Sequence, residues 1–468
     1  MRYVSTRSTA EQVDFESVVL SGVAADGGLY VPAELPRFSP QEIANWSTLD
    51  YPELAFRVLS PFVGDCLPEA DFKALLSRAY SGFGHRAVAP LRQIDRNEWV
   101  LELFHGRTGS AKDFAARLQA QLVGYFLQRR QRHGVLVGAS NGDTALAAID
   151  AFKDCPQTQV LVFYPQHGVP EQQGQQLQAA HNPGLWRFAV QGSFDDCQTL
   201  VARLLRQWPL AEREVIGFNS SNWVGVMAQL VLYFHAVLQL GGGQRPIGFS
   251  VPAASFAEVY AGYIVQKMGL PITQMIVATN RNDALHQLFL KNRYCRAEAS
   301  QSLSPAMDLS LFANLERFVW ELYGQDPHAV AGLMQRFEGS GEMTLGNEFW
   351  LQARMIIDSY SVSDEETGKE ISSLYRDTGY IIDPHAAIGV LAARLYRRSL
   401  VAPMVTLGEI APAKSARLLG SLGIPGLAPQ PVAAPSTAQW QALAADDFAA
   451  VLHCLKAVSY THLRAHET

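Results

Sequence analysis

The chain has 468 residues, 48% of them hydrophobic, so it can bury a large core and is long enough for two or three domains. A formal net charge of −6 argues against a nucleic-acid partner or an anionic membrane surface. Five widely spaced cysteines without a Cys-x-x-Cys pair favour reduced thiols over zinc ligands, and no other metal spacing is evident. With no basic and apolar leader, and no apolar run near the roughly 20 residues of a bilayer span, we expect a soluble, cytoplasmic protein.

The first 90 residues mix short helical patterns with turns and end near Pro90. From about residue 96 the pattern changes to short apolar runs that alternate with amphipathic stretches of helical length. Such alternation predicts an α/β fold whose parallel sheets are covered by helices on both faces. The predicted strands cover 99–104, 134–137, 159–164 and 247–251, and the predicted helices cover 112–130, 222–239 and 255–268.

The C-terminal part contains prolines at 425, 429, 431 and 435, so residues 424–437 are expected to form a linker or an extended surface segment. A C-terminal helix is expected to complete the segment 424–456. Residues 457–468 show no apolar period and resemble translated sequencing-adapter read-through, so they are excluded from the fold prediction.

Residues 101–114 read Leu-Glu-Leu-Phe-His-Gly-Arg-Thr-Gly-Ser-Ala-Lys-Asp-Phe. Lys112 follows an apolar run and a glycine-containing turn and stands at the start of a predicted helix. An amine in this position lies inside a cleft, where it can condense with an aldehyde. The stretch resembles the Leu-Phe-His-Gly-Pro-Thr-Leu-Ala-Phe-Lys-Asp-Phe signature of threonine synthases, whose lysine carries pyridoxal 5′-phosphate (PLP).

The resemblance to threonine synthases continues, in the family's order, from the N-terminus to about residue 420. It implies a fold-type II PLP enzyme, similar to tryptophan synthase β, with cofactor and substrate in a cleft between two parallel-sheet α/β domains. The expected parts are an N-terminal region at 1–90, a domain with the PLP lysine at 91–235, and a second domain with the phosphate loop at 236–423. The other matching blocks are 1–7, 26–32, 194–198, 278–283, 304–308, 379–380, 383–387 and 412–414.

Lys112 is the catalytic residue that the resemblance implies. Its loop differs from the family pattern, because Arg107 replaces a proline and residues 109–111 replace Leu-Ala-Phe. Two large apolar side chains that would keep the amine dry and lower its pKa are therefore lost. The alternative is a solvent-facing lysine in the first turn of a helix.

The cofactor phosphate should be received by backbone N–H groups between a strand and a helix. There the family has Gly-Asn-Phe-Gly followed by an aspartate. This chain has Ala254, Ser255, Phe256 and Ala257 followed by Glu258, which keeps the negative charge. If either alanine must adopt a left-handed backbone it costs roughly 1–2 kcal/mol, and each added Cβ also crowds the phosphate. The alternative is an ordinary turn that binds no anion.

A second glycine-rich turn, at 138–145, resembles the family's Ala-Thr-Ser-Gly-Asp-Thr-Gly. Ser140, Asn141, Asp143 and Thr144 could receive the substrate carboxylate there, at a helix N-terminus. Asn-Gly-Asp-Thr is also a good helix-capping turn, so both interpretations stay open.

The partner of the cofactor's ring nitrogen differs in type. Glu409 stands where the family has the threonine of Thr-Ala-His before Pro-Ala-Lys. A hydroxyl leaves the nitrogen unprotonated, whereas a carboxylate favours the protonated ring, which is a stronger electron sink. The alternative is that Glu409 points into solvent.

The cations that would bind the substrate's phosphate are largely replaced. Gly168, Pro170 and Gly225 stand where the family has a basic residue, a serine and an arginine. Arg107 is expected to bind the substrate phosphate, and together with His167 it compensates only in part for the lost groups. Each charge-assisted hydrogen bond that is lost is worth roughly 1.5–3 kcal/mol.

Three functions remain open for a protein that takes a small amino-acid substrate as a monomer or homodimer. The first is PLP-dependent conversion of O-phospho-L-homoserine and water to L-threonine and phosphate, with activity weakened or altered by these replacements. The second is a catalytically silent paralogue with a binding or scaffold role. The third is a PLP lyase that acts on a non-phosphorylated amino acid.

Overall fold

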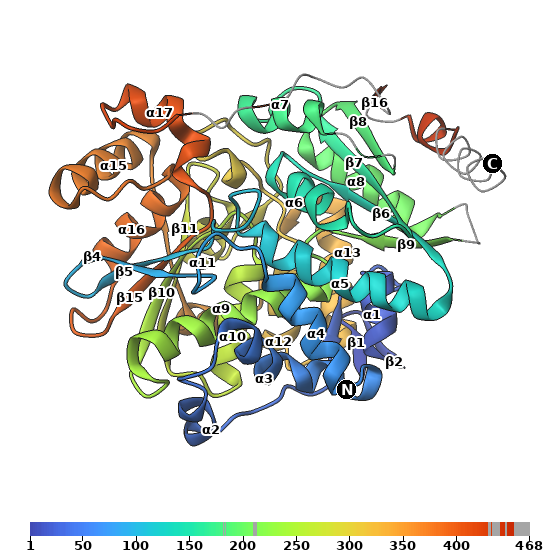
Figure 1. Ribbon diagram of the computed structural model, residues 1–468, viewed down its shortest axis with the longest axis horizontal. Coiled ribbons are helices and arrows are strands. Elements are labelled where there is room, and N and C mark those ends of the chain that lie inside the picture. Colours follow the sequence, from blue (N-terminus) through green and yellow to red (C-terminus); the bar gives the residue numbers. More distant parts are fainter. Residues whose placement is uncertain are drawn as a thin grey trace.

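The computed structural model describes residues 1–180, 182, 184–208, 213–428, 432, 440–444 and 447–453. An N-terminal region with a small antiparallel sheet of order β2-β1-β3 lies below two larger α/β units (Figure 1). Its strands are β1 (Tyr3–Ser5), β2 (Ser8–Val13) and β3 (Tyr30–Pro32), and its helices are α1 (Phe15–Ser21), α2 (Pro40–Asn45), α3 (Tyr51–Val63) and α4 (Glu69–Tyr80), with a 3-10 turn at Gly64–Cys66.

The first α/β unit is built on a five-stranded parallel sheet of order β16-β8-β7-β6-β9. Its central strands are nearly continuous apolar runs, as expected for a parallel sheet that is buried on both faces. The strands are β6 (His133–Ala139), β7 (Thr158–Pro165), β8 (Leu185–Gln191), β9 (Arg213–Gly217) and β16 (Trp440–Ala444), and the helices are α5 (Lys112–Arg130), α6 (Asp143–Phe152), α7 (Glu171–Ala179) and α8 (Phe194–Arg206).

The second α/β unit contains a six-stranded sheet of order β14-β11-β10-β15-β5-β4, parallel except for the edge strand β4. Its strands are β4 (Leu91–Asp95), β5 (Glu98–Glu102), β10 (Ile247–Pro252), β11 (Ile272–Thr279), β14 (Ile357–Ser361) and β15 (Met404–Gly408). The helices of this half are α9 (Trp223–Gly241), α10 (Ala257–Lys267), α11 (Ala284–Lys291), α12 (Leu315–Leu322), α13 (Pro327–Ser340), α14 (Asn347–Ile356), α15 (Asp364–Thr378), α16 (Pro384–Tyr396) and α17 (Ala416–Ser421). Two 3-10 turns lie at Pro305–Met307 and Pro412–Ser415. A small two-stranded sheet is formed by β12 (Tyr294–Cys295) and β13 (Glu342–Met343).

Two segments lie in a different part of the fold from the one expected. Residues 91–102 were expected in the unit that carries Lys112, but β4 and β5 belong to the six-stranded sheet, where β5 pairs with β15. Within 424–456, for which a linker and a helix were expected, β16 adds a parallel strand to the edge of the five-stranded sheet. Most of the expected linker at 424–437, and all of the tail at 457–468, lie outside the described residues.

Helix α9 runs through the centre of the molecule (Figure 1) and packs against α3, α5 and α10. Although no apolar run long enough for a membrane span was expected, α9 meets that criterion by length and composition. The protein itself buries 78% of this apolar stretch. Such burial is typical of the core helix of a globular protein.

Candidate active site

Lys112 is the first residue of α5, and its loop is held against the segment that follows β15. The Ala111 N–H donates to the Glu409 carbonyl at 2.7 Å, and the Ala411 N–H donates to the Gly109 carbonyl at 3.0 Å. Gly109 has a positive φ of 68°, a conformation that favours glycine. These bonds bring Lys112 and Glu409 together from positions far apart in the sequence.

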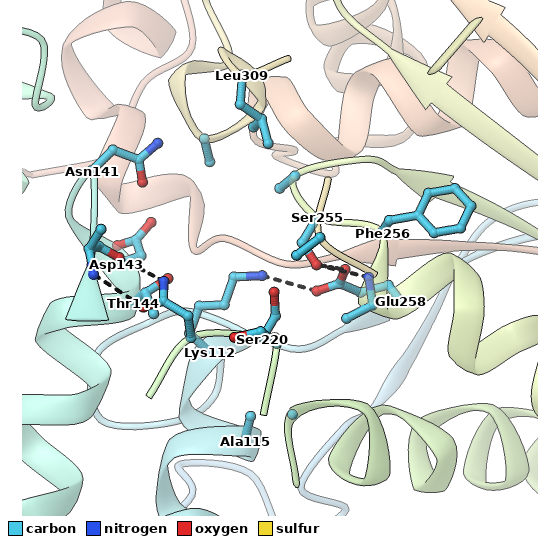
Figure 2. A pocket seen from close by; sticks show the side chains of 18 of the residues that line it. Lys112, Ala115, Asn141, Asp143, Thr144, Ser220, Ser255, Phe256, Glu258 and Leu309 are labelled. Atoms are coloured by element: carbon cyan, nitrogen blue, oxygen red, sulfur yellow. Dashed lines mark hydrogen bonds and ion pairs between the residues drawn. The ribbon is translucent and has the colours of Figure 1, made fainter. Parts of the chain in front are cut away.

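A cavity of about 160 Å³ lies between the two α/β units at this point (Figure 2). It is lined from the first unit by the starts of α5 and α6, and from the second by the start of α10 and the end of β15. Ligands of parallel α/β sheets bind at such carboxyl ends of strands. The expected site residues that line it are Lys112, Asn141, Asp143, Thr144, Ala254, Ser255, Phe256, Ala257 and Glu409.

The Lys112 amine points into this cavity, and 22% of its side chain is exposed. Its Nζ lies 3.0 Å from Glu258 Oε1 and 3.6 Å from Glu409 Oε2. Burial acts to lower the pKa of Lys112, but the negative charges of Glu258 and Glu409 outweigh it and hold that pKa above its ordinary value. The amine is therefore a paired ammonium ion and not a solvent-facing side chain.

Glu409 faces the same cavity, and only 3% of its side chain is exposed. Burial, reinforced by the charge of Glu258 and opposed by that of Lys112, raises the pKa of Glu409 to about 8. Its Oε1 atom is buried and has no hydrogen-bond partner among the described residues. An orphaned oxygen of this kind is ready to pair with a ligand nitrogen.

The loop 253–256 before α10 adopts no left-handed backbone, and neither does Ala257. The strain considered for Ala254 and Ala257 is therefore absent. The backbone N–H groups of Ser255 and Phe256 donate to no described residue, so they remain available to an anion at the helix N-terminus. The side chain of Ser255 is engaged, because its hydroxyl donates to Glu258 Oε2 at 2.6 Å.

The turn at 138–145 divides its residues between two roles. Ser140 is buried, and its Oγ accepts from the N–H groups of Gly142 at 3.0 Å and Ala145 at 2.9 Å, so it organises the turn and does not line the cavity. Asn141 and Thr144 face the cavity (Figure 2). Asp143 also lines it and forms a buried ion pair with Lys414 of the second unit. This pair fastens the two units together beside the site.

The structure does not place Arg107 in the cavity, which corrects the expectation that it binds the substrate phosphate. The turn from Gly106 to Gly109 directs its side chain outward, toward Arg117 and Asp150. Thr108, one residue on, turns inward and binds the Asp113 carboxylate through both its N–H and its hydroxyl at 2.9 Å. Such local turn geometry is not readable from the motif.

Several lining residues were not among the expected ones, above all Glu258, which had been noted only for its charge. Gln119, Asn219, Ser220 and Ser221 add polar groups. Three of these residues belong to the stretch 219–223, which reads Asn-Ser-Ser-Asn-Trp and could have identified those three from the sequence. Among the described lining residues Lys112 is the only one with a cationic side chain.

These residues fit PLP at three points. Lys112 presents an amine that suits its aldehyde, the start of α10 presents free N–H groups that suit its phosphate, and the orphaned Glu409 oxygen could pair with its ring nitrogen. One feature opposes the fit, because the Glu258 carboxylate lies in the first turn of α10. The cavity is also smaller than the roughly 300 Å³ of a typical ligand site. Because the Lys112 amine is engaged by Glu258, its reaction with an aldehyde requires this pair to part.

Comparisons with known proteins agree with this geometry. The family described as "Pyridoxal-phosphate dependent enzyme" matches residues 85–407, and "Threonine synthase N terminus" matches residues 2–80. A threonine synthase of Pseudomonas aeruginosa is 47% identical over 92% of this chain and 92% of its own length. Threonine synthase-like 2 of Homo sapiens is 33% identical over 83% of this chain and 82% of its own length.

Among solved structures, PLP-bound threonine synthase from Brucella melitensis superposes with a TM-score of 0.89 and 36% identity, covering 98% of this chain and 100% of that one. The fold and the lysine cleft define a PLP-dependent enzyme of fold type II. Within that class the chain belongs to the threonine synthase family.

The proton of Glu409 gives a pH prediction. Because its pKa of about 8 exceeds the ordinary 4.5, Glu409 contributes stability that is complete below pH 4.5 and is lost as the pH rises through 8. Between pH 6.5 and 8 we expect the free energy of unfolding of the PLP-free protein to fall by about 2 kcal/mol. The slope of this fall with pH corresponds to about one proton taken up on folding. Thermal unfolding across this window should show a smaller fall in the midpoint for Glu409→Gln. An equal fall in both proteins would contradict a raised pKa.

In the window from pH 6.5 upward, two other buried groups contribute little to the change in stability. Burial raises the pKa of Asp113 to about 6, so its contribution is already lost at pH 6.5. Burial lowers the pKa of His235 from 6.5 to about 4, so loss of the proton from its unfolded form adds a small gain in stability at the start of the window. This gain is opposite in sign to the Glu409 effect and is the same in both proteins.

Proposed function

We propose that the protein catalyses the PLP-dependent conversion of O-phospho-L-homoserine and water to L-threonine and phosphate. The observation that carries this proposal is the Lys112 amine, which projects into the cleft between the two α/β units of a threonine synthase fold. The alternative of a silent paralogue is not favoured, because the described residues leave an open cavity in front of this amine, with Glu258 as its closest partner.

We infer that Lys112 links to the cofactor's aldehyde, that the N-terminus of α10 receives its phosphate, and that Glu409 faces its ring nitrogen. When bound, the cofactor supplies an electron sink that acidifies the substrate's Cα–H. When not linked to the cofactor, the Lys112 amine would be the group that moves protons at the substrate's Cα and Cβ. Glu409 is protonated below about pH 8 and so offers a proton to the ring nitrogen.

Asn141 and Thr144, beside the N-terminus of α6, are proposed to hold the substrate carboxylate. The free N–H groups and the dipole of a helix N-terminus favour a negative charge there. The paired Asp143 and Lys414 keep this helix in place against the second unit. The substrate is thereby oriented from one unit and the cofactor largely from the other.

A second candidate function rests on the charges of the lining residues. A substrate phosphate that enters the described cavity meets no cation except Lys112, which two carboxylates already share. A dianion there lacks the charge-assisted bonds that usually hold it. This arrangement favours a PLP lyase that acts on a non-phosphorylated amino acid.

A direct assay separates these functions. The purified protein is incubated with PLP, its near-visible absorbance is recorded, and phosphate and threonine are measured after O-phosphohomoserine is added. Equimolar phosphate and threonine support the first function. A coloured protein that releases no phosphate but deaminates serine or threonine supports the second. A protein that takes up no PLP is a silent paralogue.

We further propose that the protein acts in the cytoplasm, as a monomer or a homodimer. Support comes from the charge and cysteine pattern of the sequence and from the deep burial of its most apolar helix. Size-exclusion chromatography with light scattering would distinguish monomer from dimer.

A further inference from the structure

A second, larger cavity lies on the other side of α5 from the Lys112 site. It has a volume of about 610 Å³ and is a groove between α4, α5 and the end of α6. Its charged lining residues are Arg78, Arg107, Arg117, Asp150 and Asp154. None of them lines the Lys112 cavity, and the proposed function uses none of them.

Arg117 is rigidly positioned in this groove, and only 12% of its side chain is exposed. Its Nε donates to the Ala79 carbonyl at 2.6 Å, and its Nη2 donates to the Ser81 carbonyl at 2.8 Å. These bonds fix the guanidinium plane and leave Nη1 directed at Asp150, 3.8 Å from Oδ2.

Arg107 converges on the same carboxylate oxygen, with its Nη1 at 3.9 Å from Asp150 Oδ2. Both separations exceed hydrogen-bond length, and this oxygen is buried with no hydrogen-bond partner among the described residues. The other oxygen of Asp150 is paired with Lys153 at 2.6 Å. Asp150 is thus largely neutralised by a lysine, and two guanidinium groups share one oxygen that neither of them binds.

Three arginines thus face Asp154 and the shared oxygen of Asp150, so positive charge is in excess in the groove. Burial, and next the charge of Arg107, lower the pKa of Arg117 against the opposing charges of Asp150, Asp113 and Asp154, as expected for two guanidinium groups held close together. Arg78, whose Nε donates to Gln121 at 2.9 Å, adds a third positive charge. Planar guanidinium groups match phosphate and carboxylate oxygens in pairs, so an anion between them would relieve this repulsion.

We propose that this groove is a binding site for a small multivalent oxyanion, held by Arg107 and Arg117 with Arg78 beside them. Phosphate and carboxylate groups share the required chemistry. The site is separate from the proposed PLP chemistry, and it accounts for the outward position of Arg107 where the family pattern has a proline.

Calorimetric titration of the full-length protein at constant ionic strength tests this proposal, with pyrophosphate and citrate as probes. We expect pyrophosphate, citrate or both to bind, and Arg107→Gln to weaken that binding at least tenfold. Asp150→Asn should strengthen it several-fold, because the competing carboxylate is removed. Arg376→Gln is the control, since this arginine lies on the exposed surface of α15 and should leave binding unchanged.

The two probes identify the ligand chemistry, since preference for pyrophosphate indicates a phosphate compound and preference for citrate indicates a carboxylate. Failure of the wild-type protein to bind either probe would overturn the proposal. So would binding that Arg107→Gln leaves unchanged, because the anion would then sit elsewhere, for example at the N-terminus of α10. Neither result depends on whether threonine is formed.

Discussion

Replacement of Lys112 by alanine is expected to remove the covalent attachment of PLP and to lower turnover by at least about 10³-fold. Lys112 presents the only cationic side chain among the described residues that line the cavity, so no described neighbour offers a second amine. The measurement is the near-visible absorbance of the PLP-treated protein, together with borohydride reduction and the mass of the labelled peptide. The wild-type label should map to Lys112.

Lys112→Arg is the matched control for the fold. Arginine keeps a positive charge beside Glu258 and Glu409, so this variant should remain as stable as the wild type but bind no PLP covalently. Lys112→Ala should be less stable, since it leaves the buried Glu258 carboxylate with no cation. A borohydride label on another residue, such as Lys414, would show that the site is wrongly assigned.

Local patterns predicted much of the framework. The helix predicted over 112–130 has the bounds of α5, and the predicted strands at 134–137, 159–164 and 247–251 lie within β6, β7 and β10. The helix is long enough, and the short strands are apolar enough and bounded by turn residues, for the local sequence to distinguish helix from strand. The strand predicted at 99–104 ends at Glu102, since the chain there leaves the sheet for the Lys112 loop.

Strand partners were not predictable in the same way. The sequence of β5 identifies a buried strand, but its pairing with β15 joins positions 98–102 to 404–408 and depends on the whole fold. The same reason applies to β16, which pairs with β8. A local pattern carries no information on which distant strand completes a sheet.

The candidate site was predicted where a motif fixes the direction of a side chain, and not elsewhere. Lys112 and Glu409 face the cavity because backbone bonds tie their segments together. Arg107 belongs to the same motif, but its turn directs it to the opposite side of α5. The backbone strain considered for the glycine-to-alanine changes does not arise, because the backbone of Ala254 and Ala257 is not left-handed.

Glu409 is the charged residue of the cavity that departs from the expected pattern, whereas Glu258 keeps the negative charge of the aspartate expected there. Glu258 and Glu409 share one ammonium ion, and the mutual repulsion of these carboxylates helps Glu409 to keep its proton. Lys112 and Ser255 hold the pKa of Glu258 below its ordinary value against the effect of burial, so this carboxylate stays charged. A permanent negative charge thus lies where the cofactor phosphate is expected.

Glu258→Gln is therefore expected to increase the affinity for PLP at least tenfold. The amide removes a like charge from the first turn of α10 and still offers an oxygen to the Ser255 hydroxyl, which now donates to Glu258 at 2.6 Å. It also frees Lys112 from its closer carboxylate, so uptake of PLP should be faster at neutral pH. The measurement is a titration of the PLP-free protein, followed by near-visible absorbance and its rate of appearance.

Glu365→Gln provides the control for the change in net charge, because Glu365 lies on the exposed surface of α15, where it pairs only with Lys369 among the described residues. It should leave both the affinity and the rate unchanged. If Glu258→Gln weakens PLP binding while the protein stays folded, Glu258 would be a direct support of the bound cofactor. The present assignment of Glu258 as a competing anion would then be wrong, whereas the assignment of Lys112 would stand.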